Sequence, residues 1–533
     1  MFERLKNINK IKLGLLNTNI LLVFFLILLS NLGVLPFQKM GDFLFFVFLI
    51  LVFALYRPGW AFLFFIGTIA LENINLAPRE IGIMIRPYQF FGTLSILAIA
   101  IRFLAKRLNF PLIKLKWPDY LIILLAISSF MSAFASPDKM ASLKLAVIFL
   151  SFVFLYFLSR TFIQNADDLK RIVPFFLSSS LIIIFYGIWQ NIQFIFGGNA
   201  FETMPGRPNA TFFEADWLGM YLVLLLATLY SFIYYFNKKL SAISGIINEI
   251  INYKLQKIIL YTIYLVLTAS YILLILTVSR SAWLGAATVT LIFLIIILTN
   301  LKSNNWKWKL FTKVLRNLAI AGICSIGIVY FFNLTSFQLF NRAQSTGTGL
   351  QKITIACEKR VVLPETIADI EELKKHDCKH INLEDIESNK SAGKIIMEVY
   401  RPDPNVNIRQ EIYQKSLAEI KDHPIFGVGW GSIGKVLGTD ERGTDLNSSN
   451  IFLEIYLGSG VVGFLAFIIV WIYILVSSIR NFYSAKNELY KTVAAFILLG
   501  LIGLTTANLF NAGILLGFIW VFLALGLINK KPS

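Results

Sequence analysis

Charged side chains are scarce in this 533-residue chain, at 15% of all residues, whereas hydrophobic residues make up 57%. This ratio excludes an ordinary water-soluble globular protein, because a soluble core cannot bury so much apolar surface. The sequence also lacks internal repeats, heptad runs and low-complexity tracts, so it gives no sign of a repeat protein or a coiled coil. Much of the surface of this chain must therefore be solvated by lipid.

A continuous basic patch is also missing, although the net charge is +18. The Lys and Arg residues lie in short clusters between apolar runs, for example at 102–116 and 302–316. Clusters of this kind are typical of the cytoplasmic loops of membrane proteins, and they do not indicate a nucleic-acid partner.

Apolar stretches recur along the whole chain, and most are close in length to the roughly 20 residues that a helix needs to cross a bilayer. We predict 14 spans, with 12 as the alternative, at residues 17–36, 41–56, 59–71, 88–105, 118–135, 142–160, 172–194, 214–236, 257–278, 283–300, 316–333, 451–477, 490–508 and 511–528. With 14 spans, every basic cluster and both termini face the cytoplasm. The first stretch lacks a small-residue cleavage site, and we expect a retained span rather than a removable signal.

One long hydrophilic segment, residues 334–450, interrupts the spans and is predicted to lie outside the cytoplasm. It carries 17 of the 31 acidic residues but only 15 of the 49 Lys and Arg residues, in keeping with the positive-inside bias. Within it we predict a helix from Pro364 to Lys375. A second helix is predicted from Ile408 to Lys421, because Ile408, Ile412, Tyr413, Leu417 and Ile420 share one face.

All three His residues and two of the three Cys residues lie in this loop. Cys357 and Cys378 could form a disulfide in an oxidising compartment, could join His376 and His380 around a zinc ion, or could remain free. The spacing H-x-C-x-H is not a standard zinc site, and the sequence leaves the three alternatives open.

Gly429, Gly431 and Gly434 form a G-x-G-x-x-G pattern, which in another context would suggest a dinucleotide site. No strand–helix–strand unit surrounds it here. We therefore predict a tight glycine-rich turn against the membrane surface.

Three arginines are predicted near the outer membrane face, namely Arg207, Arg280 and Arg409. A guanidinium group keeps its charge and holds phosphate oxygens in a bidentate manner, so converging arginines would suit a diphosphate. The alternative for each is that it reaches out to lipid headgroups. Glu214, Asp216 and Glu454 lie at the starts of spans, and any of them could act as a base.

Three pieces of this pattern resemble the O-antigen ligase and O-antigen polymerase family of membrane glycosyltransferases. The first is R-P-N-A-T-F-F-E-A-D-W-L-G-M-Y from Arg207, and the second is S-R-S-A-W-L-G from Ser279. The third runs from Arg409 through D-H-P-I-F-G-V-G-W-G to N-S-S-N-I-F-L-E-I-Y-L-G-S-G-V-V-G. Their order and spacing around one large loop carry the likeness over about residues 207–470.

The resemblance implies an all-helical fold of the GT-C kind and a donor glycan on undecaprenyl diphosphate. It also implies transfer without a metal or other cofactor, with arginines matching Arg207, Arg280 and Arg409 holding the diphosphate. Fixed cations at a dry membrane boundary would stabilise such a leaving group. The candidate catalytic residues are Arg207, Arg280, Arg409, Ser449, Asn450 and Glu454.

One departure from the family pattern concerns the residues before the span that follows the loop. Ligases of the family carry a His-Asn pair there, whereas this chain has Ser449 and Asn450. Serine is a poor general base at neutral pH. The departure favours a repeat-unit polymerase, or an exopolysaccharide or protein-glycan relative, over a lipid A ligase. Residues 351–404 look like an insertion relative to the family pattern, and the resemblance implies nothing about their role.

The sequence therefore predicts an all-α polytopic membrane protein of four parts: N-terminal spans at 1–206, spans with the first family motifs at 207–333, the extracytoplasmic loop at 334–450, and C-terminal spans at 451–533. We expect a glycosyltransferase of the cytoplasmic membrane that moves a glycan from undecaprenyl diphosphate to a glycan, lipid or protein acceptor. The alternative is a transporter or flippase of lipid-linked sugars. It is disfavoured because the ionisable residues concentrate outside the spans and no repeated half is visible.

Overall fold

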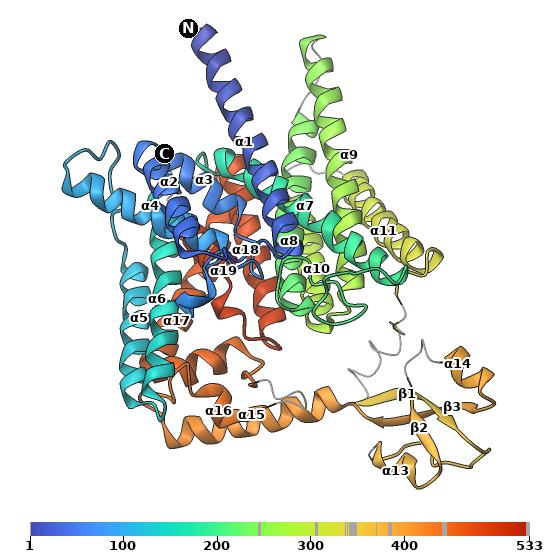
Figure 1. The fold of residues 1–533 in the computed structure, drawn as a ribbon. Coiled ribbons are helices and arrows are strands. Elements are labelled where there is room, and N and C mark those ends of the chain that lie inside the picture. The colour runs from blue at the N-terminus through green and yellow to red at the C-terminus, as the bar shows by residue number, and fades with distance from the viewer. Residues whose placement is uncertain are drawn as a thin grey trace.

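The computed structural model is a helical bundle with a small sheet beside one end (Figure 1). It describes residues 2–242, 247–303, 308–335, 337, 339, 349–368, 370–381, 386–439 and 445–528. Both chain ends lie in the upper part of Figure 1, and the sheet lies at the bottom. We call the end of the bundle that faces the sheet the loop end.

Within the described residues, eleven helices are long and apolar enough to cross a membrane. They are α1 (Phe2–Asn31), α4 (Pro87–Leu104), α5 (Trp117–Ala135), α6 (Lys139–Phe162), α7 (Leu169–Ile195), α8 (Ala215–Ala242), α9 (Ile247–Leu276), α10 (Arg280–Ser303), α11 (Trp308–Phe331), α17 (Ile451–Ser484) and α18 (Glu488–Asn508). Each coincides with one of the predicted spans. The chain is therefore a multi-pass membrane protein, and its helical fold class is confirmed.

The other three predicted spans correspond to shorter helices. They are α2 (Met40–Tyr56), α3 (Pro58–Gly67) and α19 (Gly517–Leu525), the last preceded by the 3-10 turn η3 (Gly513–Leu515). The predicted spans at 59–71 and 511–528 are helical only in part, because non-helical chain with its own hydrogen bonds completes these two segments.

Buried polar contacts hold this non-helical chain in the bundle. The fully buried carboxylate of Glu72 accepts the backbone N–H of Gly517 at 2.9 Å and the hydroxyl of Tyr88 at 2.9 Å. It also pairs with Arg86, whose Nε lies 2.9 Å from Glu72 Oε2. Irregular backbone is tolerated at membrane depth only where protein satisfies its polar groups, and this cluster does so.

Helix α8 is the centre of the bundle. In its most apolar stretch, 89% of the residues are buried inside the protein, more than in any other candidate span of the described chain. Its residues from Tyr221 to Leu226 are buried on every side. A helix that is apolar all round is buried by its neighbours, and α9, α10 and α18 surround this one.

The loop contains a three-stranded antiparallel sheet that the all-α prediction lacks. Its strands are β1 (Leu350–Cys357), β2 (Cys378–His380) and β3 (Ile395–Pro402), in the order β2-β1-β3. Ile353, Ile355, Leu373 and Val399 form its small core. The predicted helix from Pro364 to Lys375 is wrong except for one turn, α13 (Glu371–Lys374), and a second short helix, α14 (Ile386–Ser391), precedes β3.

The second predicted loop helix is confirmed as α15 (Pro404–Asp422), which runs across the loop end of the bundle (Figure 1). Its buried face carries Ile412 and Ser416, with Tyr413 and Ile420 partly covered. Ile408 is 40% exposed and Leu417 is 58% exposed, so the predicted apolar face is wrong at these two residues. Pro424 follows the helix, as the sequence indicated.

The glycine-rich run forms tight turns that dock into α17. Helix α17 is interrupted at Gly460, whose φ of 66° is left-handed. The interruption frees the carbonyl oxygen of Leu457, which accepts the N–H groups of Val428 at 2.8 Å and Gly429 at 3.0 Å. A Cβ on Gly460 would overlap the Ile425 carbonyl. The part of the run before Ile433 is therefore a close-packed turn, as predicted, whereas Gly434 lies inside the short helix α16 (Ile433–Leu437).

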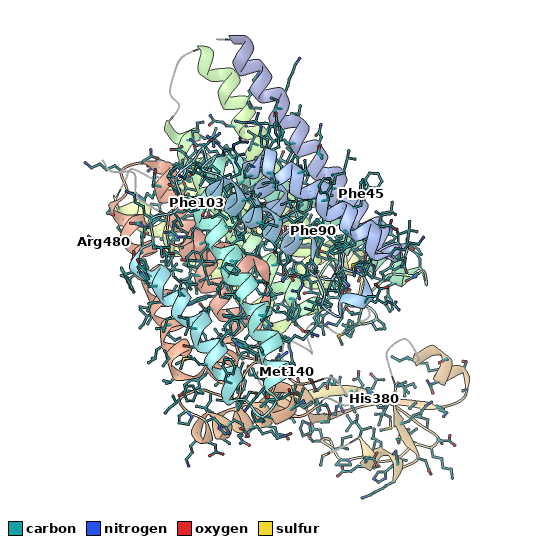
Figure 2. All side chains as sticks on the ribbon, turned by 60° about the vertical axis from the view of Figure 1, so that its left-hand side comes forward. Phe45, Phe90, Phe103, Met140, His380 and Arg480 are labelled. Carbon is teal, nitrogen blue, oxygen red and sulfur yellow. A yellow bond between two sulfur atoms is a disulfide. The ribbon has the colours of Figure 1, made fainter. Side chains whose placement is uncertain are left out.

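Labelled residues in Figure 2 mark the two ends of the bundle. Phe103 and Arg480 lie in the upper part, whereas Met140 lies near the bottom, on the same side as His380 of β2. The basic clusters around Phe103 and Arg480 are thus separated from the sheet by the membrane-spanning part of the bundle.

Candidate functional site

Charged and polar side chains from segments far apart in the sequence meet at the loop end of the bundle. The contributing segments are the chain before α8, the turn between α9 and α10, helix α15, the start of α17 and the turn after α18. Apart from α15, each is an element end or a turn, where backbone groups and polar side chains are not used up by helical hydrogen bonds.

Arg207 connects the chain before α8 to the turn that follows α9. Its Nη2 lies 3.2 Å from Asp216 Oδ2, and its Nε donates to the carbonyl oxygen of Thr277 at 3.0 Å. That carbonyl is available because α9 ends here, with Val278 at a left-handed φ of 52°. The guanidinium is only 12% exposed, so its direction is fixed by these contacts.

Arg280 is the first residue of α10, and its side chain contacts the junction between the sheet and α15. Its Nη1 lies 2.6 Å from Oδ2 of Asp403, the single residue between β3 and α15. Asp403 is 2% exposed, and its N–H donates to Gly349 at 2.9 Å. The ion pair therefore ties the candidate site to the position of the sheet.

Arg409 lies one turn inside α15 and faces the turn after α18. Its guanidinium carbon is 5.8 Å from the centre of the Phe510 ring, a cation–π arrangement. Within the described chain no acidic side chain lies within ion-pair distance of Arg409. Its charge nevertheless acts on Asp216, as does that of Arg207.

The three predicted arginines are thus brought to one region. Arg207 pairs with Asp216, the charge of Arg409 also acts on Asp216, and Asp216 accepts a hydrogen bond from Ser279, the neighbour of Arg280. On the other side of Arg280, the hydroxyl of Ser281 accepts Asn511 Nδ2 at 2.7 Å. The turn between α9 and α10 is therefore the centre of the cluster.

Asn450 and Ser449 stand at the start of α17. The Asn450 Oδ1 accepts the N–H of Phe452 at 2.9 Å and so caps the helix, while its Nδ2 donates to the Leu509 carbonyl at 3.1 Å. Tyr413 of α15 donates to the same carbonyl at 3.0 Å. Ser449 has a left-handed φ of 49°, which turns the chain into the helix.

The geometry gives Glu454 a capping role. Its Oε2 accepts both the N–H of Ser448 at 2.8 Å and the Ser448 hydroxyl at 2.6 Å. These two bonds hold the chain that precedes α17. A carboxylate occupied in this way is poorly placed to take a proton from a substrate.

Asp403, Phe510 and Asn511 belong to the cluster but were missed by sequence reasoning. Each acts through a partner more than 100 residues away, so no local spacing indicates it. Tyr413 could have been found, because it lies one helical turn after Arg409 on the predicted apolar face.

Two carboxyl groups of the chain between α7 and α8 have raised pKa values. Burial raises the pKa of Glu202 to about 7. The hydrogen bond that Glu202 accepts from the Gly206 N–H lowers the pKa and offsets only part of this shift. Burial also raises the pKa of Glu214, together with the negative charge of Asp216 and against the positive charge of Arg207. In α15, burial raises the pKa of Tyr413, and the charge of Arg409 opposes this shift.

An apolar groove of about 600 Å³ begins beside the arginine cluster. It runs between α10 and α11 with the end of α9 lining one side, and its lining residues include Leu274 of α9 together with Trp283, Ala287, Leu291 and Gly322. Trp283 lies one turn after Arg280, and its Nε1 donates to the Leu274 carbonyl at 2.9 Å. The groove thus connects the charged end of α10 with the lipid-facing surface of the bundle.

Cys357 and Cys378 form a disulfide between β1 and β2. The disulfide takes up both thiols of the possible zinc arrangement with His376 and His380. In the described parts of the chain, no three His, Cys, Asp or Glu side chains gather in a way that could hold a metal ion.

Comparison with known proteins identifies the part of the chain that carries most of these residues. Residues 263–468 match the profile of the family described as O-antigen ligase. The match includes Arg280, Arg409 and the start of α17, and Arg207 precedes it. No curated protein matches the chain. Residues 263–468 are therefore an O-antigen ligase family domain, set in a multi-pass membrane protein with eleven candidate spans among its described residues.

Proposed function

We propose that the protein is a glycosyltransferase that moves a glycan from undecaprenyl diphosphate to an acceptor hydroxyl. The observation that carries this proposal is the meeting of Arg207, Arg280 and Arg409 at one end of the bundle, beside an apolar groove. The site combines fixed positive charge with an apolar surface, and a lipid-linked diphosphate has the complementary chemistry.

The arginines suit the diphosphate because guanidinium groups hold phosphate oxygens in a bidentate manner and keep their charge at any working pH. Arg207 and Arg280 are already oriented by carboxylates, and Arg409 by an aromatic ring. Oriented cations stabilise the charge that develops on a leaving group without a cost of rearrangement.

The groove between α10 and α11 suits the polyprenyl chain. Its lining is almost entirely aliphatic or aromatic, and it begins within one turn of Arg280. A diphosphate bound by the arginines would leave the lipid chain free to lie along α10 and remain in contact with the membrane.

In the proposed reaction, the acceptor oxygen forms a bond to the anomeric carbon while the bond from that carbon to the diphosphate oxygen breaks. The electron pair of the broken bond stays on undecaprenyl diphosphate, where the arginines stabilise it. The acceptor proton leaves to a base. No metal is needed for this step, because the cationic side chains supply the charge stabilisation.

We place the site at the extracytoplasmic face of the cytoplasmic membrane. The Cys357–Cys378 disulfide in the loop fits an oxidising compartment. The near-neutral loop and the basic clusters at the opposite end fit the positive-inside bias. Ser449 in place of a histidine favours a repeat-unit polymerase over a lipid A ligase.

The test is a reconstituted assay with purified protein and an undecaprenyl-diphosphate oligosaccharide, with products resolved by mass. Longer glycans on the same lipid indicate a polymerase, and transfer to an added acceptor indicates a ligase. Arg280→Ala should abolish the product, whereas Arg480→Ala, at an exposed arginine near the opposite end of the bundle (Figure 2), should not. Full activity of Arg280→Ala would contradict the proposal, and unchanged substrate moved across the bilayer would favour a transporter.

The groove is tested separately with Ala287→Trp, which fills it from an exposed position on α10. This variant should raise the KM for the polyprenyl donor but not for a donor with a short lipid chain. Leu284→Trp adds the same bulk to a lipid-facing position that does not line the groove and serves as the control. Equal KM values for both donors in Ala287→Trp would remove the groove from the proposal.

A further inference from the structure

We propose that Glu214 is the general base that takes the proton of the acceptor hydroxyl. This inference rests on the proposed glycosyl transfer and adds the catalytic residue that the reaction requires. The acceptor oxygen becomes a good nucleophile only as it loses its proton, and serine, asparagine and arginine at this end of the bundle cannot accept one near neutral pH.

Most carboxylates of the region are already occupied. Asp216 is held by Arg207 and Ser279, and Asp403 is held by Arg280. Glu454 accepts two hydrogen bonds from Ser448. Asp216 and Asp403 are therefore weak bases, because an arginine stabilises the ionised form of each, and the Oε2 of Glu454 is already occupied by both Ser448 donors.

Glu202 is excluded by its surroundings. Its Oε2 accepts the Gly206 N–H at 2.9 Å, and its Oε1 is buried with no hydrogen-bond partner among the described residues. An acceptor hydroxyl cannot reach an enclosed oxygen atom. Glu202 therefore stabilises the turn before Arg207 and does not contact substrate.

Glu214 differs from these four residues because its side chain remains accessible beside the cluster, although the protein partly desolvates its carboxylate. It directly precedes α8, and its backbone carbonyl accepts the N–H of Leu218 at 3.2 Å, which fixes the residue at the first turn. Its carboxylate has no hydrogen-bond or ion-pair partner among the described residues. Asp216, two residues later, carries the contact to Arg207.

The charges around Glu214 also suit a base. Asp216 of α8 and Arg207 of the preceding chain act on it directly, and Arg409 of α15 acts on Asp216. Arg86 lies over the ring of the neighbouring Phe213, 5.6 Å from its centre. Burial and the charge of Asp216 together raise the pKa of Glu214, which makes its carboxylate more basic than a free one.

In the completed step, the acceptor O–H bond breaks and its proton goes to a Glu214 carboxylate oxygen. The acceptor oxygen bonds to the anomeric carbon, and the diphosphate leaves with the electron pair of its former bond. Glu214 then returns the proton to water before the next transfer. Charge and atoms balance without an oxidant, a reductant or a metal.

The test compares Glu214→Gln and Glu214→Asp with wild type in the reconstituted transfer assay between pH 5 and 8. Glu214→Gln should lower kcat by about 100- to 10,000-fold, the usual range for loss of a general base, while donor binding stays within a few-fold. Wild-type kcat should fall at acidic pH, and this acidic limb should be missing from the residual activity of Glu214→Gln. Glu214→Asp should restore part of the rate.

Glu80→Gln is the matched control, since Glu80 is also an exposed glutamate and is not one of the cluster residues. Full kcat with an unchanged pH profile in Glu214→Gln would overturn the inference, while transfer by wild type would still support the proposed function. A loss confined to donor binding would also overturn it, because Glu214 would then act on the donor. If wild type transfers no glycan, the proposed function fails, and the inference fails with it.

Discussion

Arg280 and Asp403 form a buried ion pair, 2.6 Å between Nη1 and Oδ2, that connects α10 to the junction between the sheet and α15. Asp403 is almost completely buried, and Arg280 is the central arginine of the candidate site. The position of the inserted sheet and the charge available to a donor diphosphate are therefore linked through this ion pair.

This contact predicts the effect of Asp403→Asn. The asparagine oxygen can still accept a hydrogen bond from Arg280, but it no longer neutralises the guanidinium. We expect the KM for the diphosphate donor to fall by roughly three- to ten-fold, because an unneutralised charge attracts the donor more strongly. Steady-state kinetics at low salt would measure this change, and an increased KM would show that Asp403 orients Arg280 for binding instead.

Arg280→Lys should retain a small part of the activity. Lysine keeps the positive charge but loses the planar fork that holds two phosphate oxygens at once. We expect kcat/KM to fall by roughly 10- to 100-fold, between wild type and Arg280→Ala. Equal activity of the Lys and Ala variants would mean that charge at this position makes no contribution.

Gly460→Ala should destabilise the protein by at least about 2 kcal/mol, because Gly460 has a left-handed φ and its added Cβ would overlap the Ile425 carbonyl. Thermal unfolding in detergent should give a clearly lower Tm. Gly327→Ala in α11 is the control, since nothing lies within 4 Å of the added Cβ there. Its Tm should be unchanged or slightly higher, in line with the better helix propensity of alanine.

Removing the Cys357–Cys378 disulfide with Ser at both positions should loosen the sheet. The crosslink closes a loop with a sequence separation of 21 residues, and a loop of that size contributes about 3 kcal/mol. Hydrogen exchange in β1 and β2 should speed up in the variant, or in wild type after reduction. Exchange in α8 should not change, because α8 lies in the membrane-spanning bundle.

The raised pKa of Glu202 predicts that the stability of the protein depends on pH. Its pKa is about 7 in the folded protein and near 4.5 when exposed, so between these values the folded state binds the extra proton. The contribution of Glu202 to stability is therefore fully present below about pH 4.5 and is lost as the pH rises to about 7. Between pH 5 and pH 8, the Tm of wild type should fall relative to the Tm of Glu202→Gln. A constant difference would contradict the raised pKa.

The sequence predicted the fold well wherever hydropathy and local spacing decide the structure. Eleven spans, helix α15 and the glycine-rich turn follow from patterns within short windows. The short helices α3 and α19 do not follow from such patterns. Their ends depend on the hydrogen bond from the Gly517 N–H to Glu72, which lies 445 residues away in the sequence. The sheet was missed although Ile353, Ile355 and Cys357 alternate in β1 with the period of a strand.

The candidate site was predictable only in part. The arginines could be chosen because their chemistry is distinctive, because Arg207 and Arg280 lie beside predicted spans, and because Arg409 lies at the start of the predicted loop helix. Their partners could not, because Asp403 and Phe510 are ordinary residues until folding brings them to Arg280 and Arg409. Glu214 and Glu454 look equivalent in the sequence, and only their hydrogen bonds distinguish a free carboxylate from a helix cap.

The interruption of α17 at Gly460 also sets where this protein can be recombined with relatives. The Leu457 carbonyl depends on the N–H groups of Val428 and Gly429, so residues 424–434 must be inherited together with the helix that receives them. The sheet between Leu350 and Pro402 has its own core and its own disulfide, and it could be exchanged as a cassette. A graft with boundaries inside the glycine-rich turn would instead leave a helix in the lipid bilayer with an unsatisfied backbone carbonyl.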